Sequence, residues 1–152
     1  FVFITLSIGF RSFKQATVTL VPILLVVVWL YGLMYLAGSS LNIVTVTIAT
    51  ISLGVGIDYC IHVTERYREG RESGESHEEA LIGIGGACGL ALIGSAASDI
   101  AGFSVIALSP MGLFTNFGIF SAAMIAFSLV ASLVLTTAAL GLVARKPSAE
   151  AS

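Results

Sequence analysis

The 152 residues of the chain are 57% hydrophobic and 11% charged, with a formal net charge of −2 and a mean hydropathy of +1.01. Soluble domains carry about 25% charged residues, so this composition excludes a water-soluble fold and predicts a multi-span membrane protein. The nearly balanced charge gives no support for a nucleic-acid partner. The two cysteines, Cys60 and Cys88, have no metal-ligand spacing, and we expect neither a cofactor nor a metal ion.

Alternating apolar segments and loops predict an all-α fold, a polytopic membrane helix bundle. Residues 1–10 are already apolar, and a span needs about 20 residues, so we interpret them as the end of a truncated transmembrane helix in a fragment of a longer protein. Four complete apolar segments follow, at residues 17–36, 43–64, 81–108 and 113–142. In chain order we expect a cytoplasmic loop at 11–16, a helical hairpin at 17–64, a cytoplasmic connection at 65–80, a second helical hairpin at 81–142 and a cytoplasmic tail at 143–152.

The basic residues predict the orientation of these spans. All seven lie in alternate connections: Arg11, Lys14, Arg66, Arg68, Arg71, Arg145 and Lys146. By the positive-inside rule, the basic loops and the C-terminal tail are cytoplasmic, in a multi-pass protein of the plasma membrane. Trp29, Tyr31 and Tyr35 then lie at the outer interface, where aromatic side chains gather.

Two local patterns concern the second loop and the start of the third segment. Ser76 and Glu79 have the spacing of a capping box, so a helix should begin near Ser76. The charged stretch before it is interpreted as a solvated linker or, alternatively, a regulatory site. The third segment has small residues four positions apart: Gly83 with Ala87, and Gly85 with Gly89. This spacing predicts close approach to another helix.

Two of the nine acidic residues, Asp58 and Asp99, lie inside predicted spans. On insertion scales each ionised Asp near the middle of the membrane costs roughly 2.5 to 3.5 kcal/mol. An ionisable residue at that depth is therefore a functional hypothesis by default. Burial favours the neutral carboxyl, which ionises when water or a partner arrives. Asp58 is the principal candidate for a proton carrier.

Asp58 belongs to a polar stripe on its predicted helix. The stripe recurs at intervals of three or four residues: Thr47, Thr50, Gly54, Asp58, His62 and Glu65. It predicts a face toward a water-holding bundle interior or, for its Thr and Gly positions, simple close packing of helices. His62 lies near the inner interface, where it is a candidate for proton entry or is merely easy to accommodate.

Asp99 follows Ser98 and shares a helix face with Ser95. It is either a second titrating site or a structural partner of a hydroxyl. Placed toward opposite sides of neighbouring helices, Asp58 and Asp99 should be separated vertically by roughly 12 Å, so we expect no direct hydrogen bond between them. Asp99 should instead bond to Ser95 or to a hydroxyl of the last segment. That segment carries four hydroxyls on roughly one face: Ser121, Ser128, Ser132 and Thr136.

At "GVGIDYCIHVTERYREG" the chain resembles the resistance-nodulation-division (RND) superfamily, in the branch of MMPL-type and hydrophobe exporters, which is related to the sterol-sensing-domain proteins. The similar features are a Gly-rich turn, Asp-Tyr, an Ile-His pair and an Arg-Tyr that opens a charged run. The later "AGFSVIALSPMGLFTNFGIFSAAMI" is similar to the passage between the fifth and sixth helices of that family. The resemblance covers nearly the whole chain in order.

The resemblance implies that the fragment comprises transmembrane helices two (truncated) to six of one six-helix RND-type half. It also implies proton-driven export of hydrophobic or amphiphilic substrates, with a second half and large extracytoplasmic porter domains elsewhere in the protein. The relay Asp of the family corresponds to Asp58, with Tyr59 beside it. Ser98 and Asp99 stand where relatives commonly have Thr-Thr, so the relay in this chain should be wired differently.

We therefore expect a secondary active transporter rather than an enzyme. No P-loop, nucleophile triad or zinc-site pattern is present, so the energy would come from an ion gradient or another subunit. The expected partners are membrane lipid, protons, a hydrophobic or lipid substrate, the missing half with its porter domains, and further copies of the chain. The alternatives are a sterol-sensing-type lipid-binding receptor or regulatory membrane domain, and an accessory subunit of protein translocation.

Overall fold

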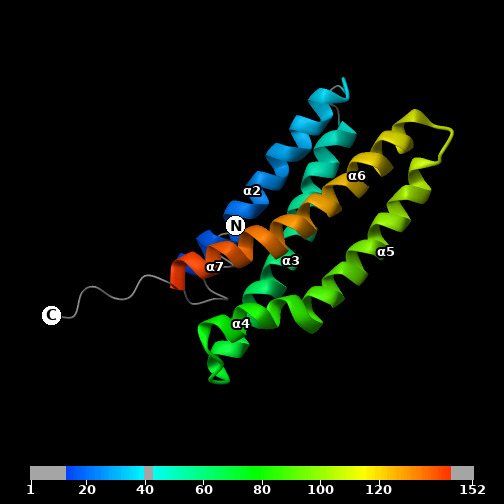
Figure 1. Ribbon diagram of the computed structural model, residues 1–152. Helices are drawn as coiled ribbons and strands as arrows, with labels where there is room; N and C mark the ends of the chain where they lie inside the picture. The colour runs from blue at the N-terminus through cyan, green and yellow to red at the C-terminus, as the bar shows by residue number, and fades with distance from the viewer. Residues whose placement is uncertain (1–12, 40–42, 145–152) are drawn as a thin grey trace.

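The structure is a computed structural model that describes the backbone of residues 13–39 and 43–144. The predicted helix end at 1–10 and most of the predicted tail lie outside these residues. The described part is helical throughout apart from short turns, and contains no strand, which confirms the all-α prediction. Its elements (Figure 1) are α2 (Phe13–Leu36), α3 (Ile43–Glu72), α4 (His77–Gly83), η1 (Ile84–Cys88), α5 (Gly89–Ala107), α6 (Gly112–Val130), η2 (Ala131–Thr136) and α7 (Thr137–Ala144).

Long apolar runs form these helices. Within the described residues, three helical runs are long and apolar enough to cross a membrane: Ile43–Glu72, His77–Ala107 and Gly112–Leu142. The shorter apolar stretch Leu20–Leu36 belongs to α2. Because a helix satisfies its backbone hydrogen bonds internally, it is the stable form of such sequences in lipid. The molecule is therefore a membrane-type helix bundle.

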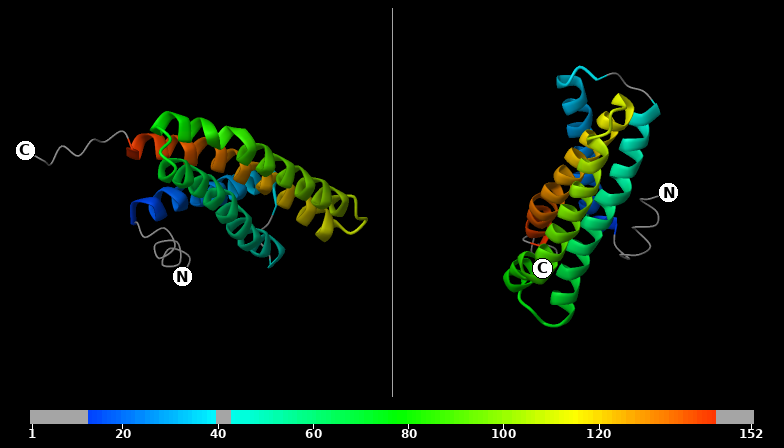
Figure 2. Two further views of the ribbon diagram at one scale, coloured as in Figure 1. Left: turned by 90° about the horizontal axis from the view of Figure 1, so that it is seen from below. Right: turned by 90° about the vertical axis from the view of Figure 1, so that its right-hand side faces the viewer.

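The helices pack as two hairpins around a shared centre. α3 contacts α2, α6, η2 and α4, whereas α5 packs chiefly along α6 (Figure 1). Figure 2 shows α5 and α6 running side by side in both further views. The buried core is mainly aliphatic and includes Leu30, Ile48, Val63 and Met124. α6 with η2 thus lies between the first hairpin and α5.

The hydroxyl face predicted on the last segment is buried in this centre. The four hydroxyl residues are each at most 1% exposed: Ser121, Ser128, Ser132 and Thr136. Thr136 Oγ1 donates to Cys60 Sγ of α3 at 3.4 Å, and Ser132 Oγ donates to the carbonyl of Leu129 at 2.9 Å. Small polar side chains of this kind let helices approach closely in a membrane bundle. The face therefore joins the last helical run to the rest of the core.

The third predicted segment is bent at its glycines. The run from α4 to α5 passes through the wide turn of η1, where Gly86 leaves the helical region with φ −75° and ψ −126°. A Cβ on Gly83 would meet the Arg66 guanidinium, and one on Gly89 would touch Leu133, but a Cβ on Gly85 would meet nothing. Of these three glycines, Gly83 and Gly89 therefore lie close to another helix, as predicted, and Gly85 does not. The glycine-rich run also interrupts the helix at Gly86.

The turn between α3 and α4 is fixed by polar contacts. α4 begins after Ser76, as predicted: Ser76 Oγ accepts from Glu79 N at 3.2 Å, and Ser76 N donates to Glu79 Oε2 at 2.8 Å. Gly74 has φ +87°, a left-handed conformation that glycine adopts without cost. Arg66 pairs with Glu75 at 3.1 Å. In the predicted connection, residues 65–72 belong to α3 and residues 77–80 to α4.

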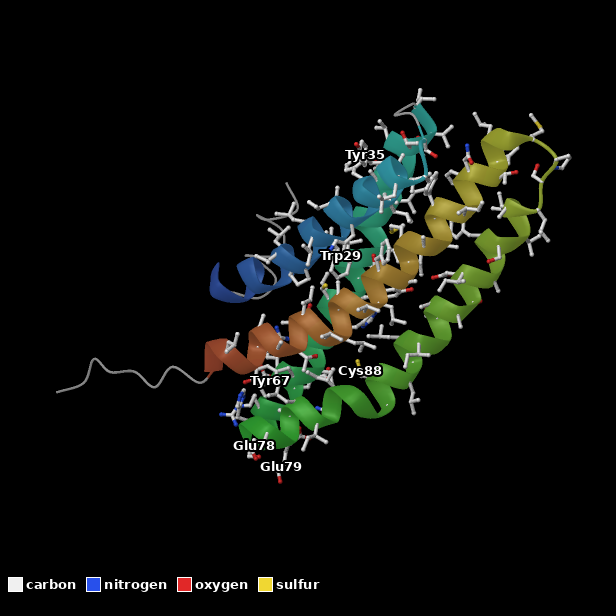
Figure 3. The ribbon with its side chains drawn as sticks, turned by 45° about the horizontal axis from the view of Figure 1, so that its top comes forward. Trp29, Tyr35, Tyr67, Glu78, Glu79 and Cys88 are labelled. Carbon is white, nitrogen blue, oxygen red and sulfur yellow. The ribbon has the colours of Figure 1, made fainter. Side chains whose placement is uncertain are left out.

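The two ends of the bundle differ in chemistry. Figure 3 shows Tyr35 at one end, with Tyr67, Glu78 and Glu79 at the opposite end. Tyr35 is 85% exposed, as expected for an aromatic residue at a membrane interface. Which end faces the cytoplasm remains the prediction made from the basic residues.

Candidate functional site

A cavity of about 490 Å³ opens between α3 and the run from η1 to α5. Its lining comes from both elements: Val55, Asp58, Tyr59, His62, Cys88, Ala91, Leu92, Ser95 and Asp99. On each element these residues recur at intervals of three or four, so each lining set is one face of a helix. Two helical faces that carry the ionisable residues of the spans therefore meet across one cavity.

The contact that joins the two faces is a hydrogen bond. Tyr59 Oη donates to Asp99 Oδ2 at 3.3 Å. The Tyr59 side chain is only 4% exposed and packs in the core, which fixes the direction of its hydroxyl, whereas Asp99 is half-buried. A phenol that donates to a carboxyl oxygen holds that side chain in place. Tyr59 thus links the Asp-Tyr pair of α3 to the second acidic residue on α5.

The structure differs from the expected partners of Asp99. Its hydrogen bond goes to Tyr59, not to Ser95 or to a hydroxyl of α6. Ser128 Oγ instead donates to Met124 Sδ at 3.7 Å, and Ser121 Oγ has no partner among the described residues. The reason is the rotation of α5 about its own axis, which turns the face of Asp99 toward α3. Helix periodicity shows which residues share a face but not which neighbouring helix that face meets.

Asp58 and Asp99 line the same cavity, and within the described part of the chain no hydrogen bond joins them. Asp58 is exposed and lines the cavity. An exposed carboxyl in the middle of a span requires water or further protein beside it, because hydrocarbon does not solvate it. Asp58 therefore requires water or further protein on the open side of the cavity.

His62 and Cys88 lie together at the cavity. Cys88 Sγ lies 3.8 Å from the carbonyl oxygen of His62, which joins η1 to α3. The His62 side chain is exposed. Ser98, the remaining predicted relay residue, is exposed and outside the cavity lining. Helix geometry accounts for this, because Ser98 lies about 100° around α5 from Asp99.

The polar stripe of α3 divides into two parts. Asp58 and His62 line the cavity, whereas Thr47 and Thr50 donate to carbonyls of their own helix at 2.8 and 3.0 Å. Glu65 pairs with Arg68 at 2.9 Å. Only the middle of the stripe therefore belongs to the site.

The sequence reasoning missed Cys88 and the apolar lining residues. The sequence pattern showed only that Cys88 lacks metal-ligand spacing, whereas in the structure it lines the cavity. One feature of the sequence could have identified these residues: positions 88, 92 and 95 lie at helical spacing from Asp99 and so share its helix face. This signal identifies a face but gives no sign that a cavity lies in front of it.

These features together define a class. The chain is an α-helical membrane protein with two carboxyls, a phenol and an imidazole around a cavity inside its spans. Ionisable groups so placed mark ion or proton pathways in membrane proteins. Among the described residues, no group of His, Cys, Asp and Glu side chains is placed to hold a metal ion.

The chain belongs to the MMPL family, whose model matches residues 1–151. This confirms the resemblance seen at the Asp-Tyr motif. The chain is 34% identical, over 90% of its length and 35% of the relative, to MJ1562 of Methanocaldococcus jannaschii, which is named as a membrane protein. It is 29% identical to the hopanoid transporter HpnN of Burkholderia multivorans, over 88% of the chain and 16% of that relative. No solved structure matches the chain.

Proposed function

We propose that this chain supplies the proton-relay region of a transporter that exports a hydrophobic or amphiphilic substrate in exchange for protons. The observation that carries the proposal is the single cavity onto which Asp58, His62 and Asp99 open, with Tyr59 bonded to Asp99. Ionisable residues inside spans are costly, and a proton pathway is a function that repays that cost. The chain spans 35% and 16% of the two curated relatives, so the complete transporter would include parts beyond it.

The chemistry of the residues suggests how the relay works. Asp58 takes up a proton from water in the open cavity and becomes neutral, which removes the cost of a charge among apolar helices. When the proton leaves, the carboxylate returns and attracts water or a partner. Across the cavity, the Tyr59 hydroxyl and the Asp99 carboxyl form a hydrogen-bonded pair, and His62 offers a site for proton entry. A proton crossing 100 mV releases about 2.3 kcal/mol, enough to bias two conformations of a helix bundle.

A lipid-like substrate is the proposed cargo. HpnN, one of the relatives, is named a hopanoid transporter, and this supports a hydrophobic or amphiphilic substrate for the present chain. The residues that select the substrate are expected in porter domains beyond this chain. The second six-helix half would cover the open side of the cavity, and further copies of the chain are compatible with this arrangement.

Replacing Asp58 tests the relay. Asp58→Asn keeps the shape of the side chain but removes the titrating group, so transport in the complete protein should fall to background while expression and unfolding temperature stay near wild type. Thr47→Val is a matched control, because Thr47 lies on the same stripe outside the cavity. Wild-type transport by Asp58→Asn would overturn the relay. It would favour the alternative, a sterol-sensing-type lipid-binding receptor or regulatory domain, in which the same helices bind lipid without coupled export.

The proposed orientation has its own test. Single cysteines introduced at Glu75 and Ala149 should be protected from an impermeant thiol reagent in intact cells, whereas those at Ser39 and Met111 should react. The expectation follows from the basic residues, all of which lie in the connections assigned to the cytoplasm. Outside labelling at Glu75 would reverse the orientation without affecting the proposal for Asp58.

A further inference from the structure

A second hollow of about 550 Å³ opens at the turn between α3 and α4. Its lining includes Arg66 of α3, Glu75 of the turn and Gly83 at the end of α4. We call it the turn pocket. Figure 3 shows Glu79, which also lines it, at one end of the bundle, and Cys88 of the cavity further in. The turn pocket and the cavity share no lining residue.

The two elements that line the cavity continue directly into the turn pocket. On α3, His62 lines the cavity, and Arg66, one turn further along, lines the turn pocket. On the facing run, Cys88 lines the cavity, and Gly83, earlier in the run, lines the turn pocket. Cys88 Sγ lies 3.8 Å from the carbonyl oxygen of His62, so the two elements touch where the cavity ends. The turn pocket therefore follows the cavity along the same pair of elements.

The Arg66 side chain lies at the boundary between the turn pocket and the cavity. It reaches from α3 to α4, where a Cβ on Gly83 would collide with its guanidinium group. Its charge is also close enough to the sulfur of Cys88 to interact with it. The guanidinium group therefore fills the space between the two elements, on the pocket side of His62 and Cys88.

Glu75 holds the guanidinium group in this space. Arg66 Nη2 donates to Glu75 Oε1 at 3.1 Å, and the two side chains are 29% and 34% exposed. A Cβ on Gly70, one turn after Arg66 on α3, would meet both the carboxylate and the guanidinium group. Arg71 Nη1 donates to the carbonyl of Glu75 at 2.7 Å, which fixes the backbone of the turn. Glycines on both helices thus leave the room that the ion pair occupies.

The turn pocket adjoins water, whereas the cavity lies within the spans. Charged side chains are costly in hydrocarbon, so the charged turn lies at the aqueous surface. The open side of the cavity faces lipid or further protein in the membrane. Water that enters from the turn pocket meets Arg66 before it reaches His62.

We propose that Arg66 is a positioning residue that gates a water path from the turn pocket to His62 and Asp58, and that Glu75 holds this gate closed. The inference rests on the proposed function, because the path would supply protons to the relay. Arg66 carries no proton itself. Movement of its guanidinium group away from Gly83 joins the turn pocket to the cavity. A partly exposed ion pair is a weak restraint, so the gate opens without unfolding of the turn.

Cys88 reports whether the gate is open. The complete protein, with every other cysteine replaced by Ala, is placed in sealed vesicles, and a small impermeant thiol reagent is added on the side of the α3–α4 turn. Glu75→Gln should raise the rate of Cys88 labelling about fivefold, as expected for the loss of one weak ion pair. Arg66→Ala should raise it further, and Arg66→Lys should stay closer to wild type. A nearby cation favours the reactive thiolate, so loss of charge alone would slow the labelling.

Matched variants separate the position of the guanidinium group from its charge. Gly83→Ala displaces the group without removing a charge and should also speed the labelling, whereas Gly85→Ala, whose Cβ meets nothing within 4 Å, should not. Arg68→Ala removes a charge that pairs with Glu65 at 2.9 Å and lines neither hollow, so it should have no effect. Unchanged labelling in Arg66→Ala and Gly83→Ala, or an equal rise in the controls, would overturn the gate.

Transport by Asp58→Asn in the same vesicles separates this inference from the proposed function, because labelling of Cys88 does not depend on transport. If the labelling rates follow the prediction while Asp58→Asn transports at the wild-type rate, the water path stands and the relay through Asp58 is wrong. If Asp58→Asn abolishes transport while all variants label at one rate, the relay stands and the gate at Arg66 is wrong.

Discussion

α5 meets its two neighbours in opposite ways. Against α6 the backbones touch: a Cβ on Gly118 would lie closer than 3.0 Å to backbone atoms of Phe103 and Ala107. Phe103 and Phe117 pack beside this contact with ring centroids 5.7 Å apart. Against α3 the same helix leaves a cavity of about 490 Å³, bridged by the bond from Tyr59 to Asp99.

α5 is therefore packed tightly on its α6 side and loosely on its α3 side. The contact with α6 consists of van der Waals packing between backbones, which leaves no freedom for sliding. The contact with α3 leaves the cavity between the helices and includes the bond from Tyr59 to Asp99, whose net worth is about 1 kcal/mol. The bend at Gly86 lies between these two kinds of contact: before it α4 packs against α3, and after it α5 packs along α6. The side of α5 that faces Asp58 and Tyr59 is therefore its more loosely packed side.

The largest expected effect is a loss of stability on the closely packed side of α5, where it meets α6. Gly118→Ala places a methyl group against the backbone of α5, which cannot shift as a flexible side chain does. Overpacking of this kind costs about 3 kcal/mol or prevents folding. Unfolding of the purified protein in mixed micelles measures the loss. Gly94→Ala on α5 is the control, because a Cβ there meets nothing within 4 Å, and it should be neutral or slightly stabilising. Equal stability of the two variants would contradict the close contact.

On the cavity side of α5 we expect a smaller effect, on the pH dependence of transport rather than on stability. Tyr59→Phe removes the donor to Asp99 but keeps the packing of the ring, so the protein should fold. Because the phenol no longer holds the Asp99 carboxyl in place, the pH midpoint of transport should move measurably. Asp99→Ser should also move the midpoint, and the double variant should add little further.

Tyr67→Phe is the matched control for this prediction. Tyr67 Oη and His77 Nδ1 lie 2.9 Å apart at the turn, outside the cavity. Removal of the Tyr67 hydroxyl should leave the pH midpoint of transport unchanged. If Tyr59→Phe and Tyr67→Phe behave alike, the bond to Asp99 has no special part in transport.

The smallest effect concerns the anchoring of α4 on α3, which fixes where the bend begins. Ser76→Ala removes one half of the capping box and should cost about 1 kcal/mol, measured as faster amide exchange in α4. Ser73→Ala in the same turn should change exchange by much less. Transport should stay near the wild-type rate, because neither serine lines the cavity. A large loss of transport with Ser76→Ala would instead show that the shape of the cavity depends on the capping box of α4.

Much of the architecture could be predicted because the membrane simplifies the problem. In lipid a long apolar run must become a helix, so four helical segments followed directly from the sequence. The capping box at Ser76 was likewise readable, since it is a local pattern of hydrogen bonds. The sequence did not show which glycines bend a helix and which ones pack, because this depends on the neighbours of Gly86 and Gly118 in space.

The sequence by itself determined that this protein is an all-helical membrane bundle of the MMPL family with two carboxyls inside its spans, because composition and spacing are properties of the chain alone. Only the tertiary structure decided that Asp99 turns toward Tyr59 and that Asp58, His62 and Asp99 share one cavity. The physical reason is that periodicity gives the residues of a helix face but not its neighbour. That choice is made when the backbones of α5 and α6 meet at Gly118 and fix how α5 is rotated toward α3.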